Sequence, residues 1–322
     1  MTSDTSPAQS HRPPPAALLV VPLVVAIVLT LFAWPSAKAG PRDLPIGVAG
    51  PPGAAQALEQ RLSAREGAFE IHRYPDEAAA RAAIEDRDVY GAFAATPGGV
   101  KLLTASAASQ PVAQLLTNAA NESGASPEVQ DVVSAGPAGG AIASSVLPLL
   151  IAGFITAALC TALTPSAVRR AGLLVAGSIL GGLVATGIAQ GWLDVIRGDW
   201  VVNAAGLSLT IFAVAALIAG LRALFGHVGA IAGAVTLVLI GNPFAGVAQG
   251  PEMLPEPAGA IGQLMPPGAG GNLLRSTGYF DGAAAGGHIA LLAAWALAGL
   301  ALLAVAAVRG RRPAVVSAPV EA

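Results

Sequence analysis

Long apolar runs separated by short polar gaps fill most of this chain, and they predict membrane-spanning helices. A helix that crosses a bilayer needs about 17–25 predominantly apolar residues, because each residue adds only about 1.5 Å to its length. Six runs reach that length, at about 16–34, 142–163, 171–190, 202–221, 225–241 and 289–308. The pattern therefore predicts six transmembrane helices.

The segment 40–140, between the first two runs, has a different pattern. It holds more than half of the charged residues, and short apolar strings alternate in it with amphipathic stretches. Strand and helix in alternation indicate a small α/β domain with a largely parallel sheet. The predicted fold class is thus a polytopic α-helical membrane protein with six transmembrane helices and an α/β domain between helices 1 and 2. Strands are expected at 45–49, 69–74, 89–95 and 100–104, and helices at 54–65, 75–86 and 111–121.

Basic residues in the short connections indicate how the helices are oriented. Cytoplasmic loops are the ones enriched in Lys and Arg, and the basic residues fall on one side if the six spans simply alternate. We therefore expect both termini in the cytoplasm and the α/β domain outside, as an extracytoplasmic domain. The residues on the predicted cytoplasmic side are Arg12, Arg169, Arg170, Arg222, Arg309, Arg311 and Arg312.

Both ends of the chain are more polar than the runs beside them. Residues 1–15 are rich in proline and predict a disordered cytoplasmic N-terminus, and 309–322 predict a cytoplasmic tail. The tripeptide Ala37-Lys38-Ala39 resembles a signal-peptidase site, so a cleaved signal peptide is the alternative to a first transmembrane helix. We favour a retained helix, because the apolar run is longer than a usual signal-peptide core.

The composition supports a membrane protein and excludes several other classes. Hydrophobic residues make up 54% of the 322 residues and charged residues 11%, with a mean hydropathy of +0.66. A soluble domain is about one quarter charged. The net charge of -2 offers no basic face for nucleic acid. Cys160 is the single cysteine, which excludes a disulfide framework and a thiolate metal site.

Nothing in the sequence gathers the groups that catalysis needs. The spans carry no Asp, Glu, Lys or Arg near their centres, which argues against proton-driven transport and intramembrane proteolysis. No metalloprotease or serine-hydrolase motif with a plausible partner occurs. The histidines His72, His227 and His288 are scattered along the chain. We therefore expect no enzyme, no metal and no cofactor.

The segment 242–287, inside a five-helix membrane domain at 142–308, is apolar but repeatedly interrupted by proline and glycine. Irregular backbone at membrane depth is tolerated only where protein or a water-filled cavity satisfies its polar groups. A re-entrant segment of short helices that dip into the outer leaflet fits this pattern, and an ordinary loop folded over the bundle is the alternative. Within the segment, Arg275 and Asp281 are expected to form a local ion pair. Tyr279 and Phe280 fit an aromatic anchor at the membrane interface.

Several stretches carry a resemblance to a known family. With one span, a large outer domain and five further spans, the chain resembles the ABC-2 type transporter permeases, and most of all the branch related to the YhgE/Pip membrane proteins. The resemblance covers roughly 16–308. The stretches that carry it are Leu44–Val48, Tyr74–Ala79, Val89–Phe93, Gly241–Gly246, Leu264–Ala269, Arg275-Ser276 and Tyr279–Gly282.

The resemblance implies a permease subunit of an exporter in a bacterial plasma membrane, moving a hydrophobic or amphipathic compound outward through the lipid bilayer. It implies a homodimer or heterodimer, powered by a separate ATP-binding subunit, since this chain has no Walker A motif. Arg169 and Arg170 would contact that ATPase. The substrate path would include Asn242, Pro243, Gly246, Pro266, Pro267, Gly268, Arg275, Tyr279, Phe280 and Asp281.

A membrane scaffold or receptor is the alternative function. The predicted cytoplasmic loops are very short, which leaves an ATPase little surface to hold. In this interpretation the outer domain binds an extracytoplasmic partner, and the helical bundle is an anchor.

Overall fold

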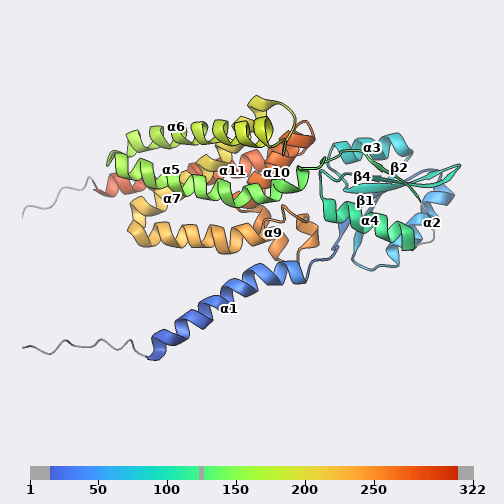
Figure 1. Ribbon diagram of the computed structural model, residues 1–322, viewed down its shortest axis with the longest axis horizontal. Helices are drawn as coiled ribbons and strands as arrows, with labels where there is room; N and C mark the ends of the chain where they lie inside the picture. Colours follow the sequence, from blue (N-terminus) through green and yellow to red (C-terminus); the bar gives the residue numbers. More distant parts are fainter. Residues whose placement is uncertain (1–14, 123–126, 311–322) are drawn as a thin grey trace, which may run out of the picture.

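The computed structural model describes residues 15–122 and 127–310 of the chain. It consists of a helical bundle and, at one end of that bundle, an α/β domain (Figure 1). The predictions of a disordered segment at 1–15 and of a tail at 309–322 lie almost wholly outside the described residues. The α/β domain follows the first helix directly, as the charge and hydropathy pattern predicts.

The α/β domain is built on a five-stranded sheet with the strand order β2-β1-β3-β4-β5. All neighbouring strands are parallel except β3 and β4, which a two-residue turn joins as an antiparallel pair. The four predicted strands and three predicted helices are present, with ends shifted by a few residues. The elements are β1 (Leu44–Ala49), α2 (Pro52–Ser63), β2 (Phe69–Tyr74), α3 (Glu77–Glu85), β3 (Gly91–Thr96), β4 (Gly99–Thr104), α4 (Gln110–Glu122) and β5 (Glu128–Asp131).

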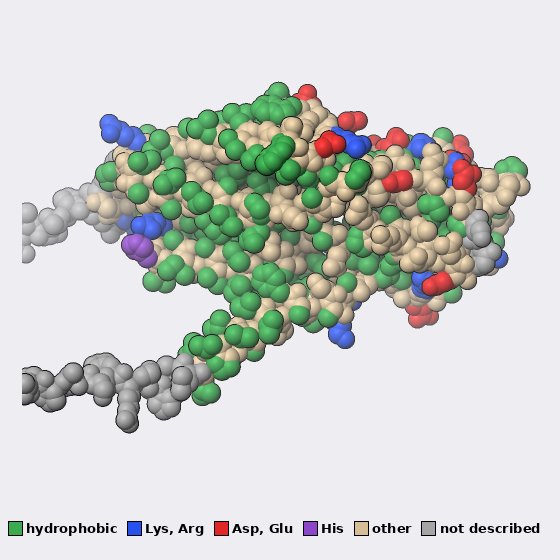
Figure 2. All heavy atoms as spheres, in the orientation of Figure 1, with side chains coloured by type: hydrophobic (Ala, Val, Ile, Leu, Met, Phe, Trp, Pro, Cys, Tyr) green, Lys and Arg blue, Asp and Glu red, His purple; other side chains and the backbone are tan. Residues whose placement is uncertain are grey.

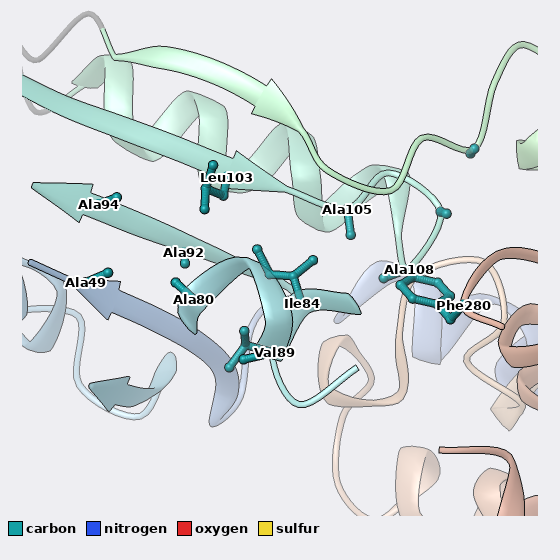
Figure 3. Close-up of a cluster of buried hydrophobic side chains, with 13 residues drawn as sticks. Ala49, Ala80, Ile84, Val89, Ala92, Ala94, Leu103, Ala105, Ala108 and Phe280 are labelled. Carbon is teal, nitrogen blue, oxygen red and sulfur yellow. The ribbon is translucent and has the colours of Figure 1, made fainter. Parts of the chain in front are cut away.

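Helices cover both faces of the sheet. On one face, α2 and α4 pack over Leu44, Ile46 and Phe93, and on the other face α3 packs over a cluster that includes Ile84 and Leu103. Figure 3 shows this second cluster, which consists mainly of alanines because α3 lies close to the strands. Phe280 also enters it, although that residue belongs to the chain segment just before the last helix of the bundle. The core of the α/β domain is therefore completed by the membrane domain.

Among the described residues, five helical segments are long and apolar enough to cross a membrane. Their outward side chains are large and apolar, as with Leu180 at 63% and Leu297 at 66% exposure, so lipid is the solvent that suits them. The protein is thus a multi-pass helical membrane protein. The main helices of the bundle are α1 (Pro15–Ala37), α5 (Val146–Leu163), α6 (Ala167–Thr186), α7 (Trp200–Thr236) and α11 (Ala285–Gly310).

The helix α7 reverses direction within its length. Gly226 has a φ of 69° and a ψ of -154°, which no helical residue adopts. A Cβ built on Gly233 would lie 2.5 Å from the Leu221 side chain, twelve residues earlier. In a straight helix those two residues would be about 18 Å apart along the axis. The two halves of α7 therefore lie side by side, joined at Gly226.

The first half of α7 is the centre of the bundle. Its residues from Ala213 to Gly220 are all buried, and it contacts α5, α6 and α11. One close approach involves α11, where a Cβ on Gly299 would lie 2.3 Å from the Ala216 carbonyl carbon. Helices in lipid associate by such close packing of small residues, because there is no hydrophobic driving force between apolar helices that lipid already surrounds.

The interrupted segment before α11 is folded into the protein. Its longest helix, α10, has 13 of its 14 residues buried between the bundle and the α/β domain. An ordinary exposed loop is therefore the wrong description of this segment. The remaining elements of the bundle and of this segment are η1 (Gly139–Ser145), η2 (Gly187–Trp192), η3 (Leu237–Gly241), α8 (Asn242–Phe244), η4 (Pro251–Met253), α9 (Ala258–Gln263) and α10 (Pro266–Tyr279).

Charged side chains are distributed unevenly along the molecule. In Figure 2, the charged side chains at the end of the bundle far from the α/β domain are basic, whereas acidic and basic side chains are mixed on that domain and near its border with the bundle. At this end, the start of α6 and the end of α11 line a common groove, and Arg170 is one of its lining residues.

Candidate functional site

A polar face on the buried helix α10 is the most unusual feature of the molecule. Asn272, Arg275 and Ser276 lie three and four residues apart, which places them on one side of the helix. Their exposures are 4%, 4% and 0%. Buried polar groups need hydrogen-bond partners, and here those partners come from the α/β domain and from neighbouring turns of the segment.

Arg275 joins three parts of the structure. Its Nε donates to the carbonyl of Ala107 at 3.0 Å, in the loop between β4 and α4. Its other nitrogens donate to the Val247 carbonyl at 2.5 Å, after α8, and to Asn272 Oδ1 at 3.2 Å. The guanidinium is always charged and offers five donors in a fixed fork, so it holds several acceptors at once. This side chain ties the α/β domain to the segment beneath it.

Arg87 reaches the same face of α10 from the end of α3. It follows α3 with a φ of 66°, at the position where most helices place a glycine. The Arg87 N–H donates to the Ile84 carbonyl and the Asp88 N–H to the Ala83 carbonyl, the two bonds of a Schellman C-cap. This backbone turn aims the guanidinium out of the domain and onto α10.

The Arg87 side chain binds both backbone and side chain of α10. It donates to the Asn272 carbonyl at 3.1 Å, to Asn272 Oδ1 at 3.2 Å and to Ser276 Oγ. Its guanidinium also lies 5.3 Å from the centre of the Phe280 ring, close enough for a cation–π contact. Burial lowers the pKa of Arg87, although an arginine remains charged at neutral pH.

Asn272 is the residue that both arginines share. Its Oδ1 accepts from Arg87 and Arg275, and its Nδ2 donates to Gln263 Oε1 at 2.6 Å. Gln263 in turn donates to the Ala245 carbonyl at 2.8 Å. The network thus runs from the α/β domain through α10 and α9 to the turn after α8. We call Arg87, Asn272, Arg275, Ser276 and Gln263 the junction network.

A second connection lies beside the junction network. The Tyr90 hydroxyl donates to Glu252 Oε2 at 2.7 Å, and the backbone N–H groups of Gly40 and Arg42 donate to carbonyls of η4. Burial, and then the charge of Glu252, raise the pKa of Tyr90, so the hydroxyl keeps its proton and acts as the donor. Both connections come from the end of the sheet that faces the bundle.

The charges at the junction do not balance. Within the described residues, neither Arg87 nor Arg275 has a carboxylate within ion-pair distance, and Glu252 is the acidic neighbour that acts on Arg87 through space. Two guanidinium groups therefore face one carboxylate. Buried charges without a direct counter-ion are costly, and hydrogen bonds to carbonyl and amide oxygens replace the counter-ion here.

The predicted path residues do not all line one cavity. Asn242, Pro243 and Gly246 line a cavity of about 200 Å³ together with Phe32 and Ser36 of α1. Pro266, Pro267 and Gly268 form the buried start of α10 and do not line that cavity.

The expected roles of Arg275, Tyr279, Phe280 and Asp281 differ from the observed ones. Arg275 does not pair with Asp281 in the described part of the chain, because its donors are used by Ala107, Val247 and Asn272. Tyr279 donates to the carbonyls of Ala135 and Val195, and Phe280 is buried in the α/β domain core. These aromatics bind the two domains together and do not form a membrane-interface anchor. Asp281 is exposed at the edge of α10.

The predicted ATPase contact lies at the opposite end of the bundle. Arg169 and Arg170 occupy the first turn of α6, after an N-cap at Ser166. Arg169 is exposed, whereas Arg170 folds back and donates to the Thr164 carbonyl at 2.9 Å. Arg170 also lines an open groove of about 840 Å³ between α6 and α11.

The sequence reasoning missed Arg87, Tyr90, Glu252 and Asn272. Arg87 had one available signal, since an arginine follows a predicted helix directly at a position that favours glycine. Asn272 had none, because an asparagine in a glycine-rich stretch is typical of a loop. Comparisons of the chain with family models, with curated proteins and with solved structures find no match.

Proposed function

We propose that this chain is the membrane subunit of an ABC-2-like exporter that moves a hydrophobic or amphipathic compound out of the cell, powered by a separate ATPase. In this proposal the chain crosses the plasma membrane six times, both termini are cytoplasmic and the α/β domain is extracytoplasmic. Two membrane subunits act together, as a homodimer or heterodimer. The resemblance in sequence to ABC-2 type permeases suggests the class.

The reversal in α7 supports six crossings. The continuous helical segment Trp200–Phe244, which α7, η3 and α8 form, has two parts, about 200–225 and 227–244. Each part is long enough to span the hydrocarbon core by itself. With the reversal counted as two spans, Gly226 lies at the same end as Arg169 and Arg309. The positive-inside rule then assigns this basic end to the cytoplasm.

The junction network is the observation that carries the proposal. A polar helix is buried where the bundle meets the α/β domain, next to a cavity lined by Asn242, Pro243 and Gly246. Any movement of α10 is passed to the α/β domain, because Arg87 and Arg275 hold both. Such a connection suits a protein whose outer domain and exit region change conformation together. The uncharged interior of the spans suits an apolar cargo.

Efflux from cells tests this proposal. A strain lacking the chain should retain fluorescent hydrophobic or lipid-like compounds longer than its parent, and the wild-type chain should restore their release. An ATPase should co-purify with the tagged protein in detergent. Equal retention in both strains, with no ATPase recovered, would remove the exporter from consideration.

The short connections at the basic end favour a second function, a scaffold or receptor. Only Thr164–Ser166 separate α5 from α6, and a single residue reverses α7. An ATPase would find little surface there. In this case the α/β domain binds an extracytoplasmic partner. Cross-linking from cysteines placed on that domain in living cells should then capture one specific extracytoplasmic partner, whereas an exporter subunit should yield only a second membrane subunit.

A further inference from the structure

The α/β domain contains a cavity that the junction network does not use. It lies between α2, α4 and the sheet, on the face opposite α3, and has a volume of about 320 Å³. Ligand sites in proteins usually enclose about 300–1,000 Å³ and are lined mainly by apolar side chains. The cavity therefore falls within the range of a small-molecule site.

The walls of this cavity are apolar. Phe69, Phe93 and Val100 come from three different strands, and Leu58 and Leu62 come from α2. On the α4 side the lining residues are alanines, such as Ala119, whose small side chains leave space against the sheet. The cavity is thus a place where the core on this face remains open, because α4 carries small residues opposite the leucines of α2.

The rim of the cavity is charged and mostly positive. Arg61 and Arg65 extend from the end of α2, and Glu122 from the end of α4. Arg65 is paired with Glu122 at 2.9 Å, across the mouth. Within the described residues, the guanidinium of Arg61 makes no hydrogen bond or ion pair. One arginine is therefore free at the entrance to an apolar cavity, and the other is held by an exposed, exchangeable ion pair.

We propose that this cavity binds a single-chain amphiphile whose hydrocarbon part fills the space between α2 and α4 and whose carboxylate or phosphate head binds Arg61 and Arg65. The apolar walls exclude a wholly polar ligand, and the rim selects an anion over a cation. The inference deepens the proposed function, since it names the class of compound that the α/β domain would take from the bundle. Its test, however, does not depend on transport.

Photo-cross-linking of the full-length protein in lipid nanodiscs tests this site. The probes are a twelve-carbon carboxylate, the phosphate monoester of the same chain, the alcohol and the trimethylammonium, each with a diazirine near the chain end. The carboxylate and phosphate should label peptides that contain Phe69 or Val100, and the alcohol and ammonium should label them far less. Comparison of the first two identifies the preferred head group.

Variants make the test specific. Replacing Arg61→Gln together with Arg65→Gln should lower labelling of those peptides about tenfold, which corresponds to about 1.4 kcal/mol, because charge contacts at an exposed rim are weak. Ala119→Leu, which fills the cavity, should abolish that labelling. Arg81→Gln, on the opposite face of the sheet, is the control and should leave it unchanged.

Two results would overturn the inference. One is labelling confined to the transmembrane helices, and the other is equal labelling of the α/β domain in the wild-type and Ala119→Leu proteins. The melting temperature of each variant shows that the protein is folded. Labelling without any effect of the chain on efflux would leave the site in place and reject the exporter. Efflux that depends on the chain, without labelling of the α/β domain, would support the exporter and reject the site.

Discussion

Arg87 combines two properties that rarely occur together. It adopts the left-handed backbone conformation of a helix C-cap, which costs a residue with a Cβ roughly 1–2 kcal/mol, and its side chain is half-buried against another domain. Asn272, at the other end of the contact, satisfies two guanidinium groups and one amide. At the scale of single residues, the junction is therefore a network in which each member depends on the others.

Arg87→Gly separates the backbone role of this residue from its side-chain role. Glycine suits the φ of 66°, so the α/β domain should keep its own fold. Three hydrogen bonds to α10 are lost, and we expect the whole protein to be less stable by about 1–3 kcal/mol in thermal unfolding. Arg87→Asn, which also tolerates this backbone, is the matched control and should behave alike. A glycine variant as stable as the wild type would contradict the role of the side chain.

Asn272→Asp and Asn272→Leu test the shared acceptor. Aspartate keeps an oxygen that accepts from both arginines and adds a negative charge beside them, but it loses the hydrogen bond that Asn272 donates to Gln263. Leucine leaves buried donors unpaired, at about 1–3 kcal/mol each. We expect the aspartate variant to melt near the wild-type temperature and the leucine variant well below it. The opposite order would show that the arginines have another acceptor.

Tyr90 predicts an alkaline limit to stability. Its pKa is raised in the folded protein, so its contribution to stability is complete below the ordinary tyrosine value of about 10 and is lost as the pH rises beyond it. Thermal unfolding of the wild type and of Tyr90→Phe should therefore be compared at pH 8 and pH 11. The wild type should lose more stability between them than the variant does. Equal losses would mean that the hydroxyl is not held at the junction.

At the scale of helices and strands, the apolar pattern carries most of the information. Lipid requires long apolar helices, so all the main helices of the bundle lie where the hydropathy places them. The strand β5 was missed because Glu128–Asp131 has one apolar residue and gains its place only by pairing with β4. The contacts of α10 were also missed. They join residues up to 189 positions apart in the chain, and no local pattern records such a contact.

The contact between α7 and α11 sets a limit on side-chain size. At Gly299→Leu the new side chain would meet the backbone at Ala216, so we expect a variant that is poorly expressed or unfolds several degrees lower in detergent. Ala298→Leu is the matched control, because Ala298 directly precedes Gly299 but is exposed to lipid, and this variant should be tolerated. If both variants behaved alike, the helix crossing described here would be wrong.

At the scale of the whole molecule, the α/β domain and the bundle form one structure. Phe280 completes the core of the α/β domain, and the junction network joins that domain to the segment before α11 (Figures 1 and 3). The domain is therefore held by core packing as well as by its connection to α1. The orientation of the protein in the membrane decides on which side the cavity with its charged rim lies, and on which side the basic end of the bundle lies.

The orientation is tested most directly by cysteine labelling in intact cells. In a Cys160→Ser background, single cysteines replace the exposed residues Glu85 and Asp199 at one end and Arg169 and His227 at the other. A membrane-impermeant maleimide should label positions 85 and 199 on intact cells, and positions 169 and 227 only after the cells are opened. Labelling of 169 or 227 from outside, with 85 protected, would contradict the account.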